Sequence, residues 1–223
     1  MEVLEDIGLK NLKIYQDTDL YRFTSDAVLL SKFASNKKGE VVADFCSGSG
    51  IVGIHYYALN ENIKSVDLIE IQPSLANLSQ KTIEYNNLQG VFTVVNKPLQ
   101  QLDKSYNEKY SLILCNPPYK KAGSGEQNGN THLAICRHEV TVTQEEIIET
   151  ASKKLKFGGR LCMCQRTERF TDLILKMREC KIEPTKIQFV VTKRNAKPYL
   201  FLVEGVKGCK PQLKVLENVV NGD

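Results

Sequence analysis

The sequence feature that most constrains the fold is a short apolar run that ends in glycines and continues into a helix. The run "EVVADFC", residues 40–46, has the length and apolar character of a buried strand. Gly48 and Gly50 follow it, and "IVGIHYYALN", residues 51–60, then shows a helical pattern. Glycines let a backbone approach a ligand closely, and the N–H groups at a helix start favour anionic groups. We therefore expect a ligand site where this strand ends.

Strands and helices alternate along the rest of the chain. Further strands are predicted at 65–71, 91–95, 111–115, 159–165, 186–193 and 198–205, and helices at 73–88, 143–155 and 169–181. Thr143 and Glu146 have the spacing of a capping box. The last two strands are close in sequence and form an expected antiparallel pair. The pattern predicts an α/β, Rossmann-like fold: a mostly parallel seven-stranded sheet with an antiparallel edge hairpin and helices on both faces.

The glycine loop fits two cofactors. Gly48, Gly50 and Gly53 form G-x-G-x-x-G, which binds dinucleotides, whereas Asp44 with the first two glycines forms D-x-x-x-G-x-G, which binds S-adenosylmethionine. Glu70 ends the second strand and suits the ribose hydroxyls of either cofactor. An acid at position 44 suits the cationic groups of S-adenosylmethionine and favours methyl transfer, although Asp44 could instead accept hydrogen bonds from the loop amides. An NAD-dependent oxidoreductase stays the alternative from a different class.

A second motif follows the strand 111–115. Asn116, Pro117, Pro118 and Tyr119 form N-P-P-Y. An exocyclic amine is a poor nucleophile because its lone pair is delocalised into the ring. The side-chain oxygen of Asn116 and the carbonyl of Pro117 can accept its N–H hydrogens and aim the lone pair at a methyl group, and the prolines preorganise that carbonyl. Tyr119 offers a ring on which a base can stack. A glutamine amide nitrogen poses the same chemical problem.

With both motifs present, the chain resembles the class I S-adenosylmethionine-dependent methyltransferases that carry N-P-P-Y, and more narrowly the bacterial tRNA-valine adenine-37 N6-methyltransferase family. "YRFTSDAVLL", "DFCSGSG", "LILCNPPY", "CRHEV", "LKFGGRL" and "PYLFLVEGVKG" carry the resemblance, which covers nearly the whole chain. It implies a class I methyltransferase fold, S-adenosylmethionine turned over to S-adenosylhomocysteine, and catalysis by residues 116–119. The cofactor-binding residues that it implies are Tyr21, Phe23, Thr24, Asp26, Asp44, Cys46, Ser47, Gly48, Gly50, Glu70, Ile71, Pro98, Leu99 and Asn116.

The segment around Phe23 has a second reading, as a loop that enters an amphipathic helix capped by Ser25 or Asp26 and contributes Phe23 and Leu29 to the core. One stretch departs from the family pattern. The family usually has an acid after the third strand that contacts the cofactor's adenine, whereas this chain has Asn96, Lys97 and Pro98 there.

Basic residues suggest an RNA partner. The segment from Lys181 to Lys214 is rich in lysine and poor in acids, although the chain carries a net charge of only +4. Such a cluster fits a phosphate-facing patch or an ordinary solvated surface. The long Gly- and Asn-rich loop 120–132 is of a kind that is often functional, and the R-H-E run 137–139 follows it. The expected RNA-binding residues are Lys120, Lys121, Arg137, Lys193, Arg194 and Lys197.

The sequence thus predicts a tRNA methyltransferase that acts on an adenine N6 amine, with adenine 37 of a valine tRNA as the favoured target. A protein glutamine or a guanine amine stays open as the acceptor, and a non-catalytic RNA-binding module as a further class. We expect one domain over 1–223, with a cofactor-covering segment at 1–38, a core at 39–206 and a tail at 207–223. The seven cysteines, without a C-x-x-C pair or a signal peptide, predict reduced thiols, no metal and a cytoplasmic, non-membrane protein that is a monomer or homodimer.

Overall fold

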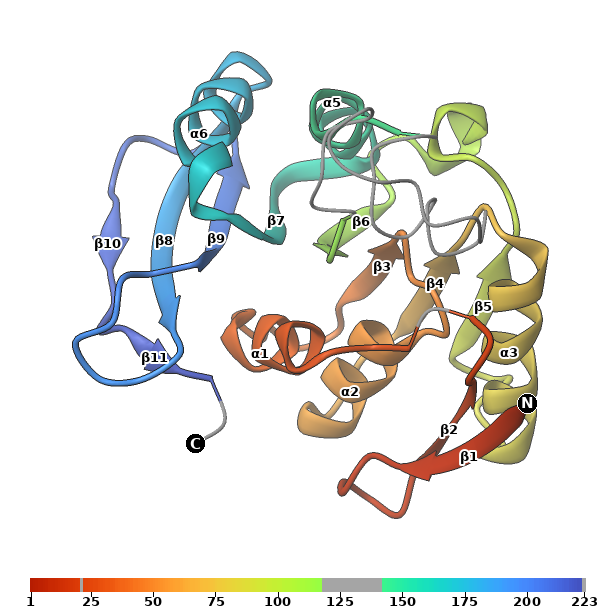
Figure 1. Ribbon diagram of the computed structural model, residues 1–223. Coiled ribbons are helices and arrows are strands. Elements are labelled where there is room, and N and C mark those ends of the chain that lie inside the picture. The colour runs from red at the N-terminus through yellow and green to blue at the C-terminus, as the bar shows by residue number, and fades with distance from the viewer. Residues whose placement is uncertain (21, 118–141, 222–223) are drawn as a thin grey trace.

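The computed structural model describes residues 1–20, 22–117 and 142–221. Its centre is a nine-stranded sheet with helices on both faces (Figure 1). Five strands run parallel in the order β7, β6, β3, β4, β5: Leu155–Arg166, Tyr110–Cys115, Val41–Phe45, Ser65–Ile69 and Phe92–Val95. The strands β8 (Ile182–Val191) and β9 (Leu200–Lys207) form an antiparallel hairpin, with β9 next to β7. The predicted mostly parallel α/β sheet is therefore confirmed.

The sheet has nine strands rather than the predicted seven because the C-terminal tail adds two short strands to it. The tail 207–223 contains β10 (Lys214–Val215) and β11 (Val219–Val220), which pair in parallel with β8 and cover its outer edge. Strands of two residues are too short to show an alternating pattern. Near the other end, β1 (Glu2–Asp6) and β2 (Lys13–Asp17) form a separate hairpin that the sequence pattern did not predict.

Helices cover the sheet on both sides. The helices α1 (Ser25–Phe33), α2 (Ile51–Leu59) and α3 (Pro73–Tyr85) lie on one face, and α5 (Gln144–Lys154) and α6 (Phe170–Glu179) lie on the other (Figure 1). Short 3₁₀ turns occur at η1 (Leu99–Gln101), η2 (Lys104–Tyr106) and η3 (Thr167–Arg169). None of the helices in the described ranges is long and apolar enough to cross a membrane.

Local side-chain chemistry accounts for the starts of α5 and α3 but not for that of α1. Thr143 and Glu146 form the predicted capping box at α5, and Pro73 is the first residue of α3. The prediction for α1 was wrong: its N-cap is Thr24 rather than Ser25 or Asp26, and the Thr24 side chain makes no capping hydrogen bond.

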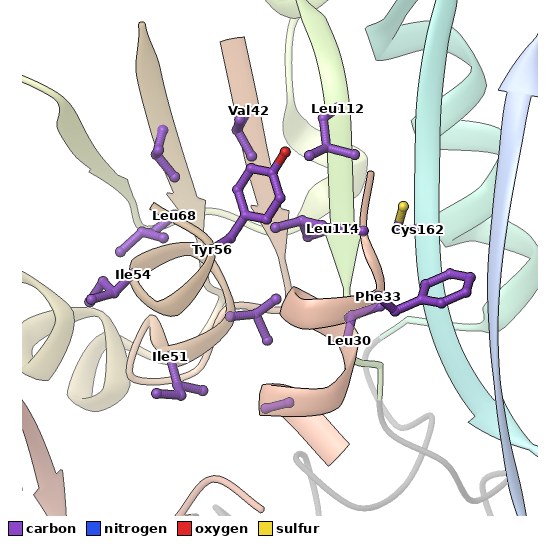
Figure 2. Close-up of a cluster of buried hydrophobic side chains, with 14 of the residues drawn as sticks. Leu30, Phe33, Val42, Ile51, Ile54, Tyr56, Leu68, Leu112, Leu114 and Cys162 are labelled. Carbon is purple, nitrogen blue, oxygen red and sulfur yellow. The ribbon is translucent and has the colours of Figure 1, made fainter. Parts of the chain in front are cut away.

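The core lies in two layers, one on each face of the sheet. Figure 2 shows the layer under α1 and α2, where Leu30 and Tyr56 meet Leu68, Leu112 and Cys162 of the strands. The opposite layer joins α5 and α6 to the sheet through buried side chains that include Ile147, Met177, Ile113, Met163 and Phe201. Because the strand side chains alternate between these layers, Cys162 and Cys164 share the α1 side of β7.

A buried ion network fastens the end of α1 to the sheet. Arg160 of β7, only 2% exposed, pairs with Glu40 and lies 3.5 Å from Glu204 of β9. Lys186 of β8 lies 3.7 Å from the same Glu204, and the backbone N–H of Ser35, just past α1, donates to that carboxylate across 3.0 Å. Removing one member would leave an uncompensated buried charge, which typically costs about 3–5 kcal/mol.

Candidate active site

The two sequence motifs meet at one edge of the sheet. Strands β3 and β6 are parallel neighbours, and Phe45 pairs with Cys115 at their carboxyl ends. The glycine loop begins at Cys46 and the N-P-P-Y motif at Asn116, so both leave the sheet at the same level, about 4.8 Å apart between strands. In α/β sheets this is the edge where ligands bind.

The glycine loop is shaped by backbone conformations that favour glycine. Gly50 has a φ of +90°, and a Cβ there would lie 2.8 Å from Cδ1 of Leu68. Gly53 sits in the first turn of α2, where a Cβ would lie 2.8 Å from Cδ2 of the same leucine. These two positions let the start of α2 pack directly onto the sheet. Cys46 also has a positive φ, of 57°, which a non-glycine residue adopts only at some cost.

Asp44 is fully buried beneath the glycine loop. Its Oδ2 accepts a hydrogen bond from the backbone N–H of Gly53 across 2.9 Å. Its Oδ1 is buried and has no hydrogen-bond partner among the described residues. Burial raises the pKa of Asp44 to about 7. One oxygen of Asp44 thus acts as an acceptor for a loop amide, which is the alternative role considered for this residue.

Glu70 holds the loop from the neighbouring strand. Its carboxylate accepts the backbone N–H groups of Gly48 and Gln72, each across 2.9 Å, and burial raises its pKa. Asn96, one of the residues that stands where the family has an acid, donates through Nδ2 to the carbonyl oxygens of Glu70 at 2.7 Å and Ile71 at 3.1 Å. The amide of Asn96 therefore braces the end of β4.

Other predicted cofactor residues lie around this edge with different burial. Ser47 is buried in the loop, and its hydroxyl has no hydrogen-bond partner among the described residues. Pro98 is half-buried before η1, and Leu99 is 5% exposed within the second core layer. The Oγ of Ser47 and the Oδ1 of Asp44 are therefore buried polar atoms of the loop without a hydrogen bond to the described residues, whereas most buried polar atoms have a partner.

The segment before α1 is tied to the glycine loop by a residue that the sequence did not mark. Gln16 of β2 is fully buried; its amide nitrogen donates to the Ser49 hydroxyl of the loop, and its oxygen accepts the N–H of Phe23 across 3.2 Å. Phe23 packs partly against the first core layer, in agreement with the prediction that it contributes to the core. Asp26 accepts the Tyr199 hydroxyl across 3.3 Å, and Tyr21 lies outside the described residues.

Asn116 is positioned by a second residue that the sequence did not mark. The thiol of Cys164, on the neighbouring strand β7, donates to Oδ1 of Asn116 across 2.9 Å. Cys164 is fully buried, and Asn116 is half-buried at the strand end. Only the pairing of β6 with β7 brings them together. Pro117 is buried, whereas Pro118 and Tyr119 lie outside the described residues.

The structure divides the basic segment that was considered as one patch. Lys193, Arg194 and Lys197 are exposed on the loop between β8 and β9, and this loop returns to the same edge as Asn116 because β8 runs parallel to β7. Lys186 instead belongs to the buried ion network, and Lys207 donates to the Leu155 carbonyl across 2.8 Å. Reading the whole segment as one phosphate-facing patch was therefore wrong. The predicted RNA-binding residues Lys120, Lys121 and Arg137 lie outside the described residues.

The sheet order, the glycine loop after β3 and the motif after the adjacent β6 define a class I S-adenosylmethionine-dependent methyltransferase. Residues 24–193 match the family described as Methyltransferase small domain, which is more than half of the chain, and the chain belongs to that family.

Relatives point in the same direction. A tRNA1(Val) (adenine(37)-N6)-methyltransferase from Shewanella sediminis is 24% identical over 183 residues, covering 80% of this chain and 73% of that protein. An enzyme of the same name from Haemophilus influenzae is 23% identical and covers 95% of this chain and 88% of its own length.

Solved structures support the fold. A predicted O-methyltransferase from Agrobacterium tumefaciens superposes with a TM-score of 0.66 at 20% identity, covering 87% of this chain and 86% of its own. Trm5 from Methanocaldococcus jannaschii, solved with adenosine, gives a TM-score of 0.67 at 16% identity over 94% of this chain and 56% of its own.

Proposed function

We propose that this methyltransferase transfers the methyl group of S-adenosylmethionine to the exocyclic N6 amine of an adenine in tRNA, with adenine 37 of a valine tRNA as the favoured target. The observation that carries the proposal is the placement of Asn116 beside the glycine loop, on adjacent strands paired through Phe45 and Cys115. The names of the relatives supply the nucleotide and the tRNA.

The residues of the glycine loop fit the cofactor. The glycine backbone at residues 48–50 would let the cofactor approach the loop closely, and the unpartnered oxygens of Asp44 and Ser47 would accept its N–H and O–H groups. Glu70, at the end of β4, would meet the ribose hydroxyls. When bound, the cofactor supplies an electrophilic methyl on a positively charged sulfur.

Asn116 and Pro117 would bind and orient the target amine. Their oxygens accept the two N–H hydrogens of the target amine, which draws the nitrogen toward tetrahedral geometry and exposes its lone pair. The new carbon–nitrogen bond forms as the carbon–sulfur bond breaks. The nitrogen then carries a positive charge and releases one proton to water, so no strong base is required. The half-buried position of Asn116 excludes part of the solvent from this contact.

The decisive experiment is methylation of total tRNA with methyl-labelled cofactor, followed by mass spectrometry of the digested nucleosides. The expected product is N6-methyladenosine, formed far more slowly when Asn116→Ala is used. Label recovered in N2-methylguanosine, or in glutamine of an added protein fraction and not in tRNA, would reject the adenine assignment. Such a result would leave the family membership unaffected.

A further inference from the structure

We propose that Arg166, whose guanidinium lies over the ring of Tyr199, is a docking point for a backbone phosphate of the RNA substrate, next to the acceptor site. The choice of RNA rests on the proposed function. Arg166 is the last residue of β7 and is exposed. No sequence motif marks it, and its neighbours in the chain form an ordinary strand end.

The sheet places Arg166 beside the reacting amine. Cys115 of β6 pairs with Met163 of β7, so Asn116 is level with Cys164, which it contacts. Arg166 is two residues further along the same strand and therefore on the same face, about 7 Å beyond. A base whose amine is held by Asn116 has its ribose and phosphates outside the sheet edge. Arg166 stands at that outer position.

The guanidinium lies over the ring of an aromatic partner. Its central carbon lies 5.4 Å from the ring centroid of Tyr199. The Tyr199 hydroxyl in turn donates to Asp26 across 3.3 Å and accepts from Asn221 across 2.6 Å, so α1 and the C-terminal tail both fix the ring. An arginine guanidinium carries its N–H donors in one plane, as a fork. This arrangement suits in-plane, bidentate binding of a phosphate.

The surrounding charge favours a polyanion over a small acid. Tyr199 closes the loop 192–199, which carries Lys193, Arg194 and Lys197 and contains no Asp or Glu. The loop and Arg166 lie at the same sheet edge, because Arg166 pairs with Leu200 at the start of β9. Several cations along one edge match successive phosphates of a nucleic acid strand. Among the described residues of this edge, Arg166 is a cation next to Asn116, and the loop cations lie further outward.

The test compares three variants of the full chain. Arg166→Ala removes both the charge and the contact with the Tyr199 ring. Arg166→Lys keeps the charge but lacks the planar fork of N–H donors. Arg178→Ala is the matched control. Arg178 of α6 is another exposed arginine. It pairs across 3.2 Å with Glu183, near the start of β8, at the end of the sheet opposite Asn116. Affinity for an unmodified tRNA transcript is measured over a series of salt concentrations, with cofactor affinity and thermal unfolding measured in parallel.

Arg166→Ala is expected to weaken tRNA binding roughly tenfold, the typical loss for a hydrogen bond to a charged group. It should also reduce the slope of log affinity against log salt by about 0.7–0.9, the value for one phosphate contact. Arg166→Lys should restore the slope but only part of the affinity. Arg178→Ala should match the wild type, and cofactor affinity should be unchanged in all three variants.

Equal tRNA affinity and salt slope for Arg166→Ala and Arg178→Ala would overturn the phosphate contact, even if the wild type methylates tRNA normally. A second result would distinguish the phosphate contact from the proposed function. A wild-type chain whose RNA binding depends on Arg166, but which methylates no RNA base, would reject the proposed function and leave the phosphate contact standing.

Discussion

The backbone N–H of Gly53 donates to Oδ2 of Asp44 across 2.9 Å and so joins the first turn of α2 to the strand beneath the glycine loop. One hydrogen bond does not offset the burial of the carboxylate, which raises the pKa of Asp44 to about 7. At neutral pH the group is therefore close to half ionised. A cation that binds at its second oxygen would favour the ionised form.

This relationship predicts a pH-dependent affinity for the cofactor. Binding of the cationic cofactor should lower the pKa of Asp44 and release a proton, so affinity should rise as pH increases through about 7. Calorimetry in two buffers of different ionisation enthalpy would measure the proton release. Asp44→Asn should weaken binding and flatten the pH profile; a profile with the same slope in that variant would assign the titration to another group.

The same pKa predicts a stability trend of definite sign. The pKa is raised above its ordinary value of 3.8, so between about 4 and 7 the folded chain holds a proton that the unfolded chain has lost. The contribution of Asp44 to stability should therefore fall as pH rises through that window and level off above it. Because Glu70 shifts in the same direction, the measurement is the difference in melting temperature between wild type and Asp44→Asn at pH 5 and pH 7.5. The variant should gain relative stability at the higher pH.

Removing the side chain of Asn116 should slow the chemical step. The lost contact strengthens as the nitrogen becomes tetrahedral, and losing one such preorganised contact typically costs roughly 100- to 1,000-fold in rate. Single-turnover methylation of tRNA at saturating cofactor measures this effect, with cofactor affinity as the control. A near-normal rate in Asn116→Ala would contradict the proposed role.

Cys164 should affect the same step more weakly, because it acts through Asn116. Cys164→Ala removes the thiol that donates across 2.9 Å, and a neutral hydrogen bond contributes about 0.5–1.5 kcal/mol. We expect kcat to fall by roughly two- to tenfold with little change in KM for tRNA. Cys164→Ser keeps a donor and should retain more of the rate. Equal losses for Ala and Ser, at equal melting temperature, would show that the hydrogen bond is not what matters.

Gly53 should not tolerate even a methyl group. Alanine is favoured over glycine in a helix by about 1 kcal/mol, but a Cβ at this position would lie 2.8 Å from Cδ2 of Leu68 and 3.3 Å from Cγ1 of Val66. Overpacking of this kind costs about 1–3 kcal/mol, so Gly53→Ala should lower the free energy of unfolding. Gly90→Ala is the matched control, since a Cβ there meets nothing within 4 Å. Chemical denaturation of both variants would measure the difference.

The loop between β8 and β9 should contribute to RNA binding through its charge. Replacing Lys193, Arg194 and Lys197 together by Ala should weaken tRNA binding and reduce its salt dependence, while cofactor affinity stays unchanged. A control with the same loss of charge replaces Lys37, Lys38 and Lys64, which are exposed before β3 and β4 at the opposite edge. Similar tRNA affinity in the two triple variants would return the loop to an ordinary solvated surface.

The sequence predicted the parts of the fold that depend on local pattern. The strand before Cys46, the capping box at Thr143 and the placement of Asn116 at a strand end each follow from residues close together in the chain. The short strands β10 and β11 follow instead from pairing with β8, which a local pattern cannot reveal. The cofactor-covering role assigned to residues 1–38 stays a prediction.

The site shows the same division. Asp44, Gly50 and Asn116 could be predicted as site residues because their motifs are contiguous. Cys164, Gln16 and Arg166 were missed because their partners lie 48, 33 and 33 residues away, as Asn116, Ser49 and Tyr199. The contact of Cys164 with Asn116 follows from the register of β6 against β7, which the sequence alone does not give. The run from Lys181 to Lys214 does not form a single basic patch because β8 and β9 cross the whole sheet within it and place its lysines at both ends.

The buried network around Arg160 also constrains how this sequence can diverge. Glu40, Arg160 and Glu204 come from three separate parts of the chain, and both glutamates are partners of Arg160. A change at one position leaves a charge stranded, whereas replacing the whole set by apolar residues is often tolerated. Neutral drift at these positions must therefore pass through unstable single mutants or proceed by simultaneous change. We expect the three residues to be inherited as a block, so that the effect of a mutation at one of them depends on which residues occupy the other two.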